Sequence, residues 1–270
     1  MICAKLIIYC EIYTFYRSGV IEMFKSERID SILEILRERK HATVDYLAEH
    51  VYASNVTIRR DLKKMEDLGL VVRSYGGVTL LDIDNKSVPL VIREQDRSSV
   101  KDKIARQAAA FIPEGSTVFL DGSSTVLRIV NYLREEQNVT VITNSLRAAT
   151  LLCEKRIKTY CTGGLLVPEA LVCVGNYSKN MLESMTADLM FFSSQGLSAD
   201  GRICDFSENE THQRRLMLDH ARKRYFLCDS SKLGKSFLFT VCHVSELDGV
   251  LCDVDAAEWL QNAAQQKETP

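Results

Sequence analysis

Three short polar segments in the C-terminal part of the chain follow apolar runs and have the residue types of ligand-binding loops. They are Asp121-Gly122-Ser123-Ser124-Thr125, Thr143-Asn144-Ser145 and Thr162-Gly163-Gly164. A glycine lets the backbone approach a ligand, hydroxyl groups donate hydrogen bonds, and the start of a following helix attracts a phosphate group. We therefore expect these loops to bind a phosphate group, and Asp121 to accept hydrogen bonds from sugar hydroxyls.

Downstream residues add charge to the same predicted site. Lys232, in Asp229-Ser230-Ser231-Lys232, is a candidate partner for the phosphate, although a surface lysine is as often simply solvated. Asp205 and Glu208 are candidate sugar contacts. Structural alternatives exist, because Ser and Thr commonly cap helices and Glu208 would stabilise the first turn of the helix after Ser207. Three similar loops favour a binding site over three unrelated caps.

These loops require a scaffold that brings them together, and the surrounding sequence supplies one. Short apolar strands alternate with helices of about ten residues, which indicates an α/β, Rossmann-like domain with a mostly parallel sheet. The expected strands are residues 117–120, 139–143, 158–161, 191–194 and 224–228. Ligands of such sheets bind beyond the carboxyl ends of the strands, where the three loops lie.

A second chemical signal lies nearer the N-terminus, in a helix predicted from Ser54 to Leu68. Its apolar residues share one helical face, and its basic residues lie on the opposite face. A basic outer face with short polar residues at the helix start suits the bases and phosphates of a DNA major groove. The candidate DNA contacts are Thr43, Ser54, Asn55, Val56, Thr57, Arg59, Arg60, Lys63, Arg73, Gly76 and Gly77.

The elements around this helix have the order of a winged helix-turn-helix. An amphipathic helix is expected over 27–40, Thr43 caps a short second helix, and strands at 70–73 and 78–81 flank a Gly-Gly turn that forms the wing. An ordinary three-helix bundle with a solvated charged face is the alternative. The hairpin that follows the basic helix favours DNA binding.

Two stretches of residue identities carry a family resemblance. The first comprises Arg28, Ile32, Leu36, the run Ser54-Asn55-Val56-Thr57-Ile58-Arg59-Arg60-Asp61-Leu62, and Arg73-Ser74-Tyr75-Gly76-Gly77. The second comprises the three loops above, Gly196-Leu197-Ser198 with Gly201, and the segment ending at Lys232. Together they resemble the DeoR family of transcriptional regulators. The resemblance implies a repressor of a carbohydrate-metabolism operon that binds double-stranded operator DNA and is released by a phosphorylated sugar.

The effector domain of that family is similar to ribose-5-phosphate isomerase, and here the sequence departs from the enzyme. Where the isomerase places closely spaced carboxylates, this chain has Ser194-Gln195-Gly196-Leu197-Ser198. Proton abstraction needs a general base within hydrogen-bond reach, so we expect no enzyme activity. Two alternatives remain open: a sugar-phosphate isomerase or hydrolase with an accessory DNA-binding head, and a winged-helix module that binds protein and not DNA.

The composition fits a regulator with a locally basic DNA-binding domain and a nearly neutral sensor domain. The chain has 270 residues, of which 46% are hydrophobic, and a formal net charge of −2. Residues 54–77 hold five Lys/Arg against three Asp/Glu, whereas residues 81–270 hold 22 against 25. The nine cysteines are scattered with no pair at two-residue spacing. We therefore expect no metal site, disulfide framework or cofactor, and a cytoplasmic protein.

The expected organisation has five parts. They are a leader or disordered arm over 1–22, a winged helix-turn-helix over 25–80, a linker over 81–92, the effector domain over 93–253, and a C-terminal helix and tail over 254–270. Charges interrupt the first 22 residues, so no membrane span is expected, and Met23 is as good a candidate for the native start as Met1. Because one head covers only a half-site, we expect a homo-oligomer, either a dimer or a tetramer.

Overall fold

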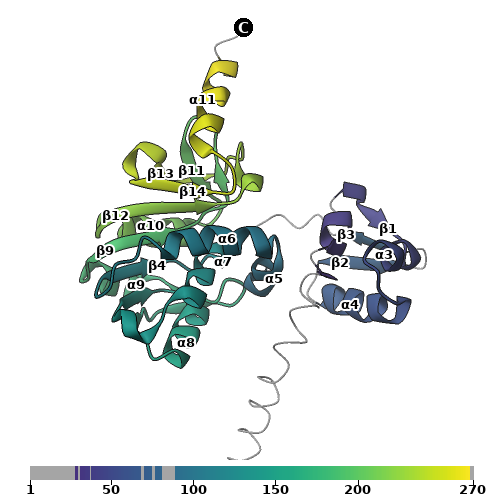
Figure 1. Ribbon diagram of the computed structural model, residues 1–270, viewed down its shortest axis with the longest axis horizontal. Helices are drawn as coiled ribbons and strands as arrows, with labels where there is room; N and C mark the ends of the chain where they lie inside the picture. The colour runs from purple at the N-terminus through teal and green to yellow at the C-terminus, as the bar shows by residue number, and fades with distance from the viewer. Residues whose placement is uncertain are drawn as a thin grey trace, which may run out of the picture. The chain divides into compact units, whose positions relative to one another are not determined.

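The computed structural model describes residues 28–29, 31–36, 38–67, 70–74, 77–80 and 89–267 (Figure 1). The described residues divide into two compact units. One contains the residues up to Leu80 together with Gln95–Ser98, and the other contains the rest. The arm expected over 1–22 and Gly76 lie outside the described residues. The domain boundaries given above stay a prediction.

The N-terminal unit is the predicted winged helix-turn-helix. Residues 28–29, 31–36 and 38–39 are helical and precede a short strand that was not predicted. The elements that follow are β1 (His41–Ala42), α3 (Val44–His50), α4 (Asn55–Asp67), β2 (Val71–Ser74) and β3 (Gly77–Leu80). The strands form an antiparallel sheet in the order β1-β3-β2. Ile32, Leu36, Leu47, Ile58 and Leu62 are buried in the unit's core.

The C-terminal unit contains a six-stranded sheet in which every neighbouring pair is parallel. Its strands are β4 (Thr117–Leu120), β5 (Thr140–Thr143), β6 (Lys158–Cys161), β9 (Ala187–Phe192), β12 (Ala221–Cys228) and β14 (Gly249–Cys252). The order across the sheet is β14-β12-β9-β4-β5-β6. The predicted α/β architecture with a mostly parallel sheet is confirmed.

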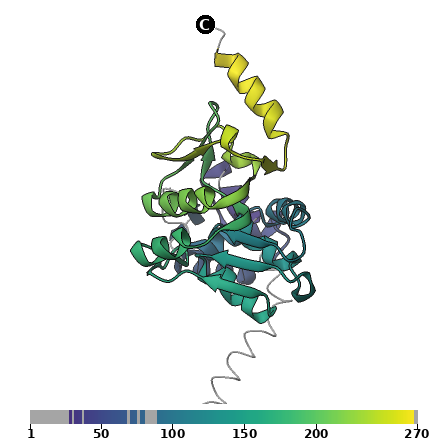
Figure 2. The same ribbon diagram turned by 90° about the vertical axis from the view of Figure 1, so that its left-hand side faces the viewer.

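Helices cover both faces of this sheet (Figures 1 and 2). Val118 and Leu120 of β4 pack on one face with the helices α6 (Ser98–Ala109), α7 (Ser124–Leu127) and α8 (Leu146–Glu154). Phe119 packs on the opposite face with α9 (Asn176–Glu183) and α10 (Glu208–Asp219). Successive strand residues point to opposite faces, so a strand with helices on both sides reads as a continuous apolar run.

Several elements differ from the sequence-based expectation. The helical segment after the first loop is the single turn α7 followed by the 3-10 helix η2 (Arg128–Tyr132), whereas a regular helix of about ten residues was expected between strands. A helix, α5 (Leu90–Gln95), lies in the region expected to be an irregular connection. Hairpin β7 (Leu165–Val167) and β8 (Val172–Val174), and a small antiparallel sheet, β10-β11-β13, were not predicted. The strands of that sheet are β10 (Gly196–Leu197), β11 (Arg202–Asp205) and β13 (Phe239–His243).

The last described element is α11 (Ala256–Lys267), which lies in the segment where a C-terminal helix was expected and extends away from the sheets in both views (Figures 1 and 2). Trp259 anchors its first turn by packing against the core. Short 3-10 turns η3 (Glu135–Gln137), η4 (Ser230–Lys232) and η5 (Val244–Glu246) complete the unit. Cys161, Cys228 and Cys252 each end a strand, and the seven cysteines within the described ranges are free thiols.

Candidate functional site

The relation between α3 and α4 is fixed by polar contacts at their N-termini. Thr43 caps α3 by accepting a hydrogen bond from the Tyr46 amide at 3.1 Å. Asn55, the first residue of α4, donates to Asp45 of α3 at 2.7 Å. Ser54 accepts from the Thr57 amide at 3.3 Å. These contacts orient α4, so three of the predicted DNA-contacting residues also have structural roles.

The two faces of α4 are divided as the sequence predicted. Ile58, Leu62 and Met65 are buried. The residues on the other side are exposed to solvent: Asn55, Val56, Arg59, Arg60, Lys63 and Lys64. Val56 is 79% exposed. The exposed face therefore combines cations with one apolar contact, as a DNA-reading helix requires.

A buried ion pair holds the first helical segment against α4. Arg28 Nε lies 2.7 Å from Asp61 Oδ2, and the Asp61 side chain is inaccessible to solvent. Both residues belong to the sequence pattern that resembles the DeoR family, but the sequence alone indicated a role for neither. Asp61 faces inward from the otherwise basic stretch of α4, so the pair stabilises the unit and leaves the outer face positive.

Four of the predicted DNA contacts border one surface hollow of about 470 Å³ on the N-terminal unit. They are Thr43, Arg59, Arg73 and Gly77, from the start of α3, from α4 and from the wing. Arg73 Nε is 3.5 Å from Glu66 Oε2, which holds it beside α4. Gly77 has φ +149°, and a Cβ atom there would lie 2.4 Å from the Ala42 carbonyl oxygen. Only glycine fits at this contact between wing and β1.

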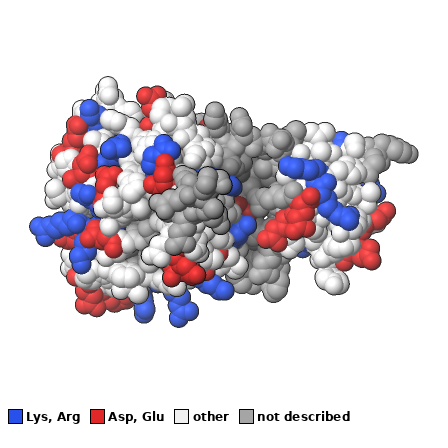
Figure 3. Space-filling model, turned by 90° about the horizontal axis from the view of Figure 1, so that it is seen from above, with Lys and Arg blue, Asp and Glu red and all other residues white. Residues whose placement is uncertain are grey.

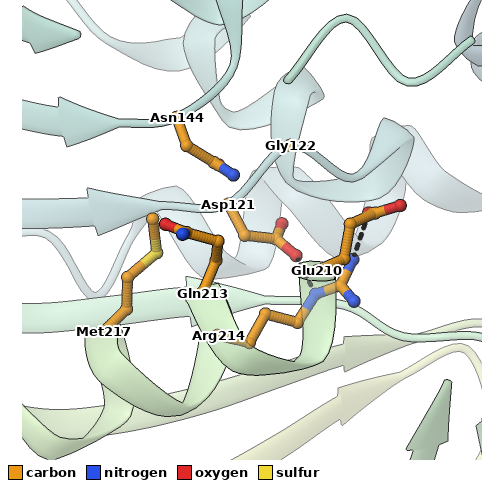
Figure 4. Close-up of a pocket in the computed structure, with 7 residues that line it drawn as sticks. All are labelled: Asp121, Gly122, Asn144, Glu210, Gln213, Arg214 and Met217. Carbon is orange, nitrogen blue, oxygen red and sulfur yellow. Dashed lines mark hydrogen bonds and ion pairs between the residues drawn. The ribbon is translucent and has the colours of Figure 1, made fainter. Parts of the chain in front are cut away.

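In the C-terminal unit, the three predicted loops follow the carboxyl ends of the adjacent strands β4, β5 and β6. The first two line a pocket together with α10 (Figure 4). Its lining residues are Asp121, Gly122, Asn144, Glu210, Gln213, Arg214 and Met217. The third loop reaches this pocket indirectly, because Ser178 Oγ is hydrogen-bonded to both Thr162 Oγ1 (2.9 Å) and Gln213 Oε1 (2.8 Å). Gly163 and Gly164 do not line the pocket.

Arg214 is the centre of a buried charge cluster. Its Nε donates to Asp121 at 2.8 Å, its Nη1 to Asp205 at 2.8 Å, and its Nη2 to Glu210 at 3.0 Å. Burial opposes the charge of Arg214, but Asp205, Asp121 and Glu210 outweigh burial and hold its pKa above the ordinary value. Figure 4 shows the guanidinium beside the carboxylates of Asp121 and Glu210. Every nitrogen of the guanidinium already has a carboxylate partner, so Arg214 has little capacity to bind an additional anion.

Asp121 and Asp205 are also fully engaged. Asp121 Oδ1 accepts from the Ser123 amide and hydroxyl, while its Oδ2 accepts from the Ser193 amide and Arg214. Asp205 accepts from the Ser207 amide, the Ser194 hydroxyl and Arg214. These carboxylates shape the site, and a direct contact of either with a sugar hydroxyl stays a prediction. Glu208 is exposed in the first turn of α10 and does not line the pocket.

Some polar side chains of the loops cap helices, and others have no hydrogen-bond partner among the described residues. Ser123 caps α7 and Ser145 caps α8, while Thr143 Oγ1 accepts from the Ser145 amide at 3.0 Å. Ser124 and Thr125 are buried within α7. Thr125 Oγ1 and Asn144 Oδ1 are buried without a hydrogen-bond partner in the described part of the chain. Asn144 also lines the pocket, so its oxygen is positioned to accept a hydrogen bond from a ligand.

Lys232 lies where the sequence placed it, at the same edge of the sheet. Its Nζ donates to Ser193 Oγ at 2.7 Å, and the Ser193 amide in turn donates to Asp121.

Gly122 allows the first loop to pass close to β8, since a Cβ atom there would lie 2.0 Å from Val172 Cγ1. Within the described ranges, no group of three or more His, Cys, Asp or Glu side chains could hold a metal ion.

Four pocket residues of α10 were missed in the sequence: Glu210, Gln213, Arg214 and Met217. Their spacing of three and four residues places them on one helical face. That pattern was present in the sequence, but these four residues were not among the candidate effector contacts. Gln213 and Arg214 are nearly fully buried, and nothing local in the sequence indicates that a polar stripe faces inward.

Together these features define a class of protein, a DNA-binding winged helix-turn-helix joined to an α/β unit with a polar pocket at the edge of its parallel sheet. Residues 28–84 match the DeoR-like helix-turn-helix domain, and residues 96–254 match the DeoR C-terminal sensor domain. The chain belongs to the DeoR family. The resemblance inferred from the sequence is confirmed.

Relatives of the chain include named repressors. It is 27% identical over 232 residues to the glycerol-3-phosphate regulon repressor of Escherichia coli K12, covering 86% of this chain and 92% of that protein. It is 32% identical over 232 residues to the transcriptional repressor GlcR of Bacillus subtilis 168, covering 86% and 89%. Ribose 5-phosphate isomerase A of Methanocaldococcus jannaschii aligns at 19% identity and a TM-score of 0.39, over 51% of this chain and 55% of that chain.

The surface of the larger unit carries charges of both signs. Lys and Arg side chains are interspersed with Asp and Glu over the face of the larger unit seen in Figure 3. This mixture agrees with the near-equal charges counted over residues 81–270. None of the helices in the described ranges is long and apolar enough to span a bilayer.

Proposed function

We propose that this protein is a transcriptional repressor of a carbohydrate-metabolism operon, and that a phosphorylated sugar bound in the pocket between β4, β5 and α10 controls its binding to operator DNA. One observation carries the proposal of a ligand: Asn144 Oδ1 is buried, lines the pocket and has no donor. An unpaired buried acceptor costs about 1–3 kcal/mol, which a ligand hydroxyl would recover. The names of the relatives, repressors of a glycerol-3-phosphate regulon among them, support the same class of ligand.

The lining of the pocket suits a polyol. Asn144 and Gln213 supply side-chain amides, and Glu210 supplies a carboxylate whose side chain is 14% exposed. Groups of this kind recognise hydroxyls, because they can accept and donate in fixed directions. The phosphate needs a cation, and Arg214 already has three carboxylate partners. Lys232, whose Nζ is 2.7 Å from Oγ of Ser193 directly after β9, is a candidate cation at this edge.

The N-terminal unit supplies the DNA contacts. We propose that Arg60 and Val56 read base edges in the major groove, that Arg59, Lys63 and Arg73 contact phosphates, and that the protein acts in the cytoplasm, where operator DNA is present. One N-terminal unit covers only half of an operator site. The form that binds DNA is therefore a dimer or tetramer on repeated or palindromic sites.

A catalytic function is not part of the proposal. The three carboxylates nearest the pocket, Asp121, Asp205 and Glu210, are all paired with Arg214. A general base must have an accessible lone pair, and hydrogen bonds from Arg214 occupy lone pairs of all three carboxylates. Incubation with pentose and hexose phosphates, followed by product analysis, tests this point: turnover would favour an isomerase with an accessory DNA-binding head.

The main test is release of the operator by a ligand. Binding sites selected from a random DNA library would be labelled and titrated with the full-length protein in a mobility-shift assay. We expect specific retardation that a sugar phosphate abolishes, whereas the unphosphorylated sugar and inorganic phosphate leave it unchanged. Specific binding that no phosphorylated sugar alters would contradict the proposed effector, and no specific binding would contradict the proposed function as a whole.

A further inference from the structure

Two cysteine side chains meet at the carboxyl edge of the parallel sheet. Cys228 is the last residue of β12, Cys252 is the last residue of β14, and the two residues are partners in the register of these adjacent strands. Their sulfur atoms lie 4.0 Å apart, although 24 positions separate the residues in the sequence. The fold therefore creates this pair, and the spacing of the cysteines along the chain did not indicate it.

The backbone at this pair already has the geometry that a disulfide bond requires. Neighbouring strands of a sheet lie about 4.7–4.9 Å apart, and cysteines joined by a disulfide have Cα atoms roughly 4.4–6.8 Å apart. Both side chains belong to the sheet face that packs against α9 and α10. The two sulfur atoms can therefore approach to an S–S bond length of about 2.05 Å without separating the two strands.

The two thiols differ in accessibility and in acidity. Cys228 is buried, whereas Cys252 is partly exposed. The hydrogen bond between the two sulfurs, together with burial, raises the pKa of Cys228, which keeps its proton. The same hydrogen bond lowers the pKa of Cys252, although burial and the carboxylate of Asp253 oppose this effect. Because the thiolate is the reactive form, Cys252 is the thiol that reacts first with an oxidant from solvent.

We propose that Cys228 and Cys252 form a modification site at which hydrogen peroxide oxidises the two thiols to a disulfide bond between β12 and β14. The inference goes beyond the proposed function and does not depend on it, because neither cysteine lines the effector pocket. A partly exposed cysteine beside a buried partner is the arrangement that reversible oxidation requires: one sulfur meets the oxidant, and the other resolves the product before further oxidation.

The reaction proceeds in two steps. The Cys252 thiolate attacks one oxygen of hydrogen peroxide, so that an S–O bond forms, the O–O bond breaks, and the hydroxide that leaves takes up a proton to become water. Cys252 is then a sulfenic acid. The Cys228 sulfur attacks the sulfur of this group, so that the S–S bond forms, the S–O bond breaks, and the thiol proton leaves with the hydroxide as a second water. The two thiols have lost two electrons, which reduce the peroxide.

The site lies beside the segment that carries Lys232. Asp253, which follows Cys252, accepts hydrogen bonds from the Ser230 amide at 2.6 Å and from the Ser230 hydroxyl at 3.0 Å. Ser230 is the first residue of η4, the 3-10 helix that ends at Lys232. Since β14 is an edge strand of the sheet, the disulfide would join this edge covalently to the strand that leads into η4.

Peptide mapping of the full-length protein tests the proposal. The reduced protein is treated under native conditions with hydrogen peroxide until the exposed Cys153 of α8 is oxidised, and it is then alkylated with N-ethylmaleimide and digested. We expect a pair of peptides joined through Cys228 and Cys252, lighter by two hydrogen atoms than the reduced peptides together and absent after treatment with dithiothreitol. Cys153→Ser, given the same dose, should yield the same product and serves as the matched control.

Two further variants test the order of the steps. Cys228→Ser removes the resolving thiol, so Cys252 should stop at the sulfenic acid, which dimedone traps. Cys252→Ser should leave Cys228 reduced at the same dose. The decisive result comes from the unmutated protein and does not depend on the folding of a variant. If Cys228 and Cys252 remain alkylatable when Cys153 is oxidised, or if either forms its disulfide mainly with another cysteine, the proposal is overturned.

Discussion

Asp121 and Arg214 are separated by 93 positions in the sequence, yet Arg214 Nε lies 2.8 Å from Asp121 Oδ2 and both side chains are almost inaccessible to solvent. The pair joins the loop after β4 to α10, which also contributes Glu210, Gln213 and Met217 to the pocket lining. Asp121 thereby orients the first loop through Ser123, and Arg214 orients Asp205 and Glu210. This contact therefore links two elements that line the pocket.

Removing the arginine should therefore destabilise the C-terminal unit strongly. Arg214→Met leaves Asp121 and Asp205 buried without their cation, and losing one partner of a buried pair costs about 3–5 kcal/mol. Urea unfolding followed by circular dichroism measures this loss. Arg222→Met is the matched control, because Arg222 is exposed beside Asp188 and should change stability by less than about 0.5 kcal/mol. Equal stabilities of the two variants would show that the cluster is not a structural requirement.

Two glycines of the site loops should tolerate a methyl group very differently. A Cβ atom at Gly122 would lie 2.0 Å from Val172 Cγ1, whereas no atom lies within 4 Å of a Cβ atom at Gly163. Gly122→Ala should cost about 1–3 kcal/mol through overpacking and weaken effector binding, because the first loop must shift away from β8. Gly163→Ala should behave like the parent protein. Thermal unfolding with and without a bound sugar phosphate measures both effects, and the reverse order of the two variants would contradict the described loop packing.

Much of the fold was predictable because it depends on local patterns. The strands β4, β5 and β6 are apolar runs that end in loops of similar composition, and the alternation with helices predicts a parallel sheet. The N-terminal unit was equally predictable, since the inner and outer faces of α4 differ in residue type. These patterns establish on which face or at which end of its own helix or strand a residue lies. For parallel strands, they also establish which loops lie at the same edge of the sheet.

Features that depend on contacts across the chain were not predictable from one sequence. The helix α5 has only six residues, and its position depends on Lys101, Arg128 and Glu169, none of which is a neighbour in sequence. The loop residue Asp121 was expected to contact a sugar, but the structure shows its oxygens occupied by four donors. That outcome depends on Arg214, and a carboxylate's sequence neighbours do not reveal whether its lone pairs are free.

Substitutions on α4 should separate the reading of bases from the binding of phosphates. Arg60→Ala should cost about 1–3 kcal/mol at the preferred site and flatten the preference at one base position. Lys63→Ala should weaken binding to all sequences alike and reduce the dependence of log K on log salt by about one unit. Fluorescence anisotropy with variant operators at several salt concentrations distinguishes the two. If both variants bind as the parent does, α4 is not the reading helix.

The stability of the protein should depend on pH through Glu94 of α5. Burial raises the pKa of Glu94 above its usual 4.5, although Arg147 and Arg128 oppose the shift. The folded protein then retains a proton that the unfolded chain has lost, so stability falls as pH rises from the unfolded pKa to the folded pKa. The glutamine of Glu94→Gln cannot ionise, so this variant should not lose stability over that pH range. Relative to the parent protein, the variant should therefore be more stable at neutral pH than at a pH below the unfolded pKa.

Urea unfolding at a series of pH values from about 4 to about 8 measures this effect. The difference in unfolding free energy between Glu94→Gln and the parent should grow across the window just above pH 4.5 and then remain constant. Glu258→Gln is the control, because Glu258 is exposed in α11. A pH-independent difference for Glu94→Gln would mean that the Glu94 carboxyl is not desolvated in the folded protein.

The control of DNA binding by the effector should be reciprocal. A ligand that releases the operator must bind better to the arrangement that fits DNA poorly, and linkage then requires operator DNA to weaken ligand binding by the same factor. Couplings of this kind typically amount to about 1–3 kcal/mol, or roughly 5- to 150-fold in affinity. Calorimetric titration of the sugar phosphate into free protein and into the protein–operator complex measures the factor directly. Lys232→Ala should abolish the response to ligand while the operator, which contacts the other unit, still binds. Equal ligand affinities in the two titrations of the parent protein would refute the coupling, even if both ligands bind.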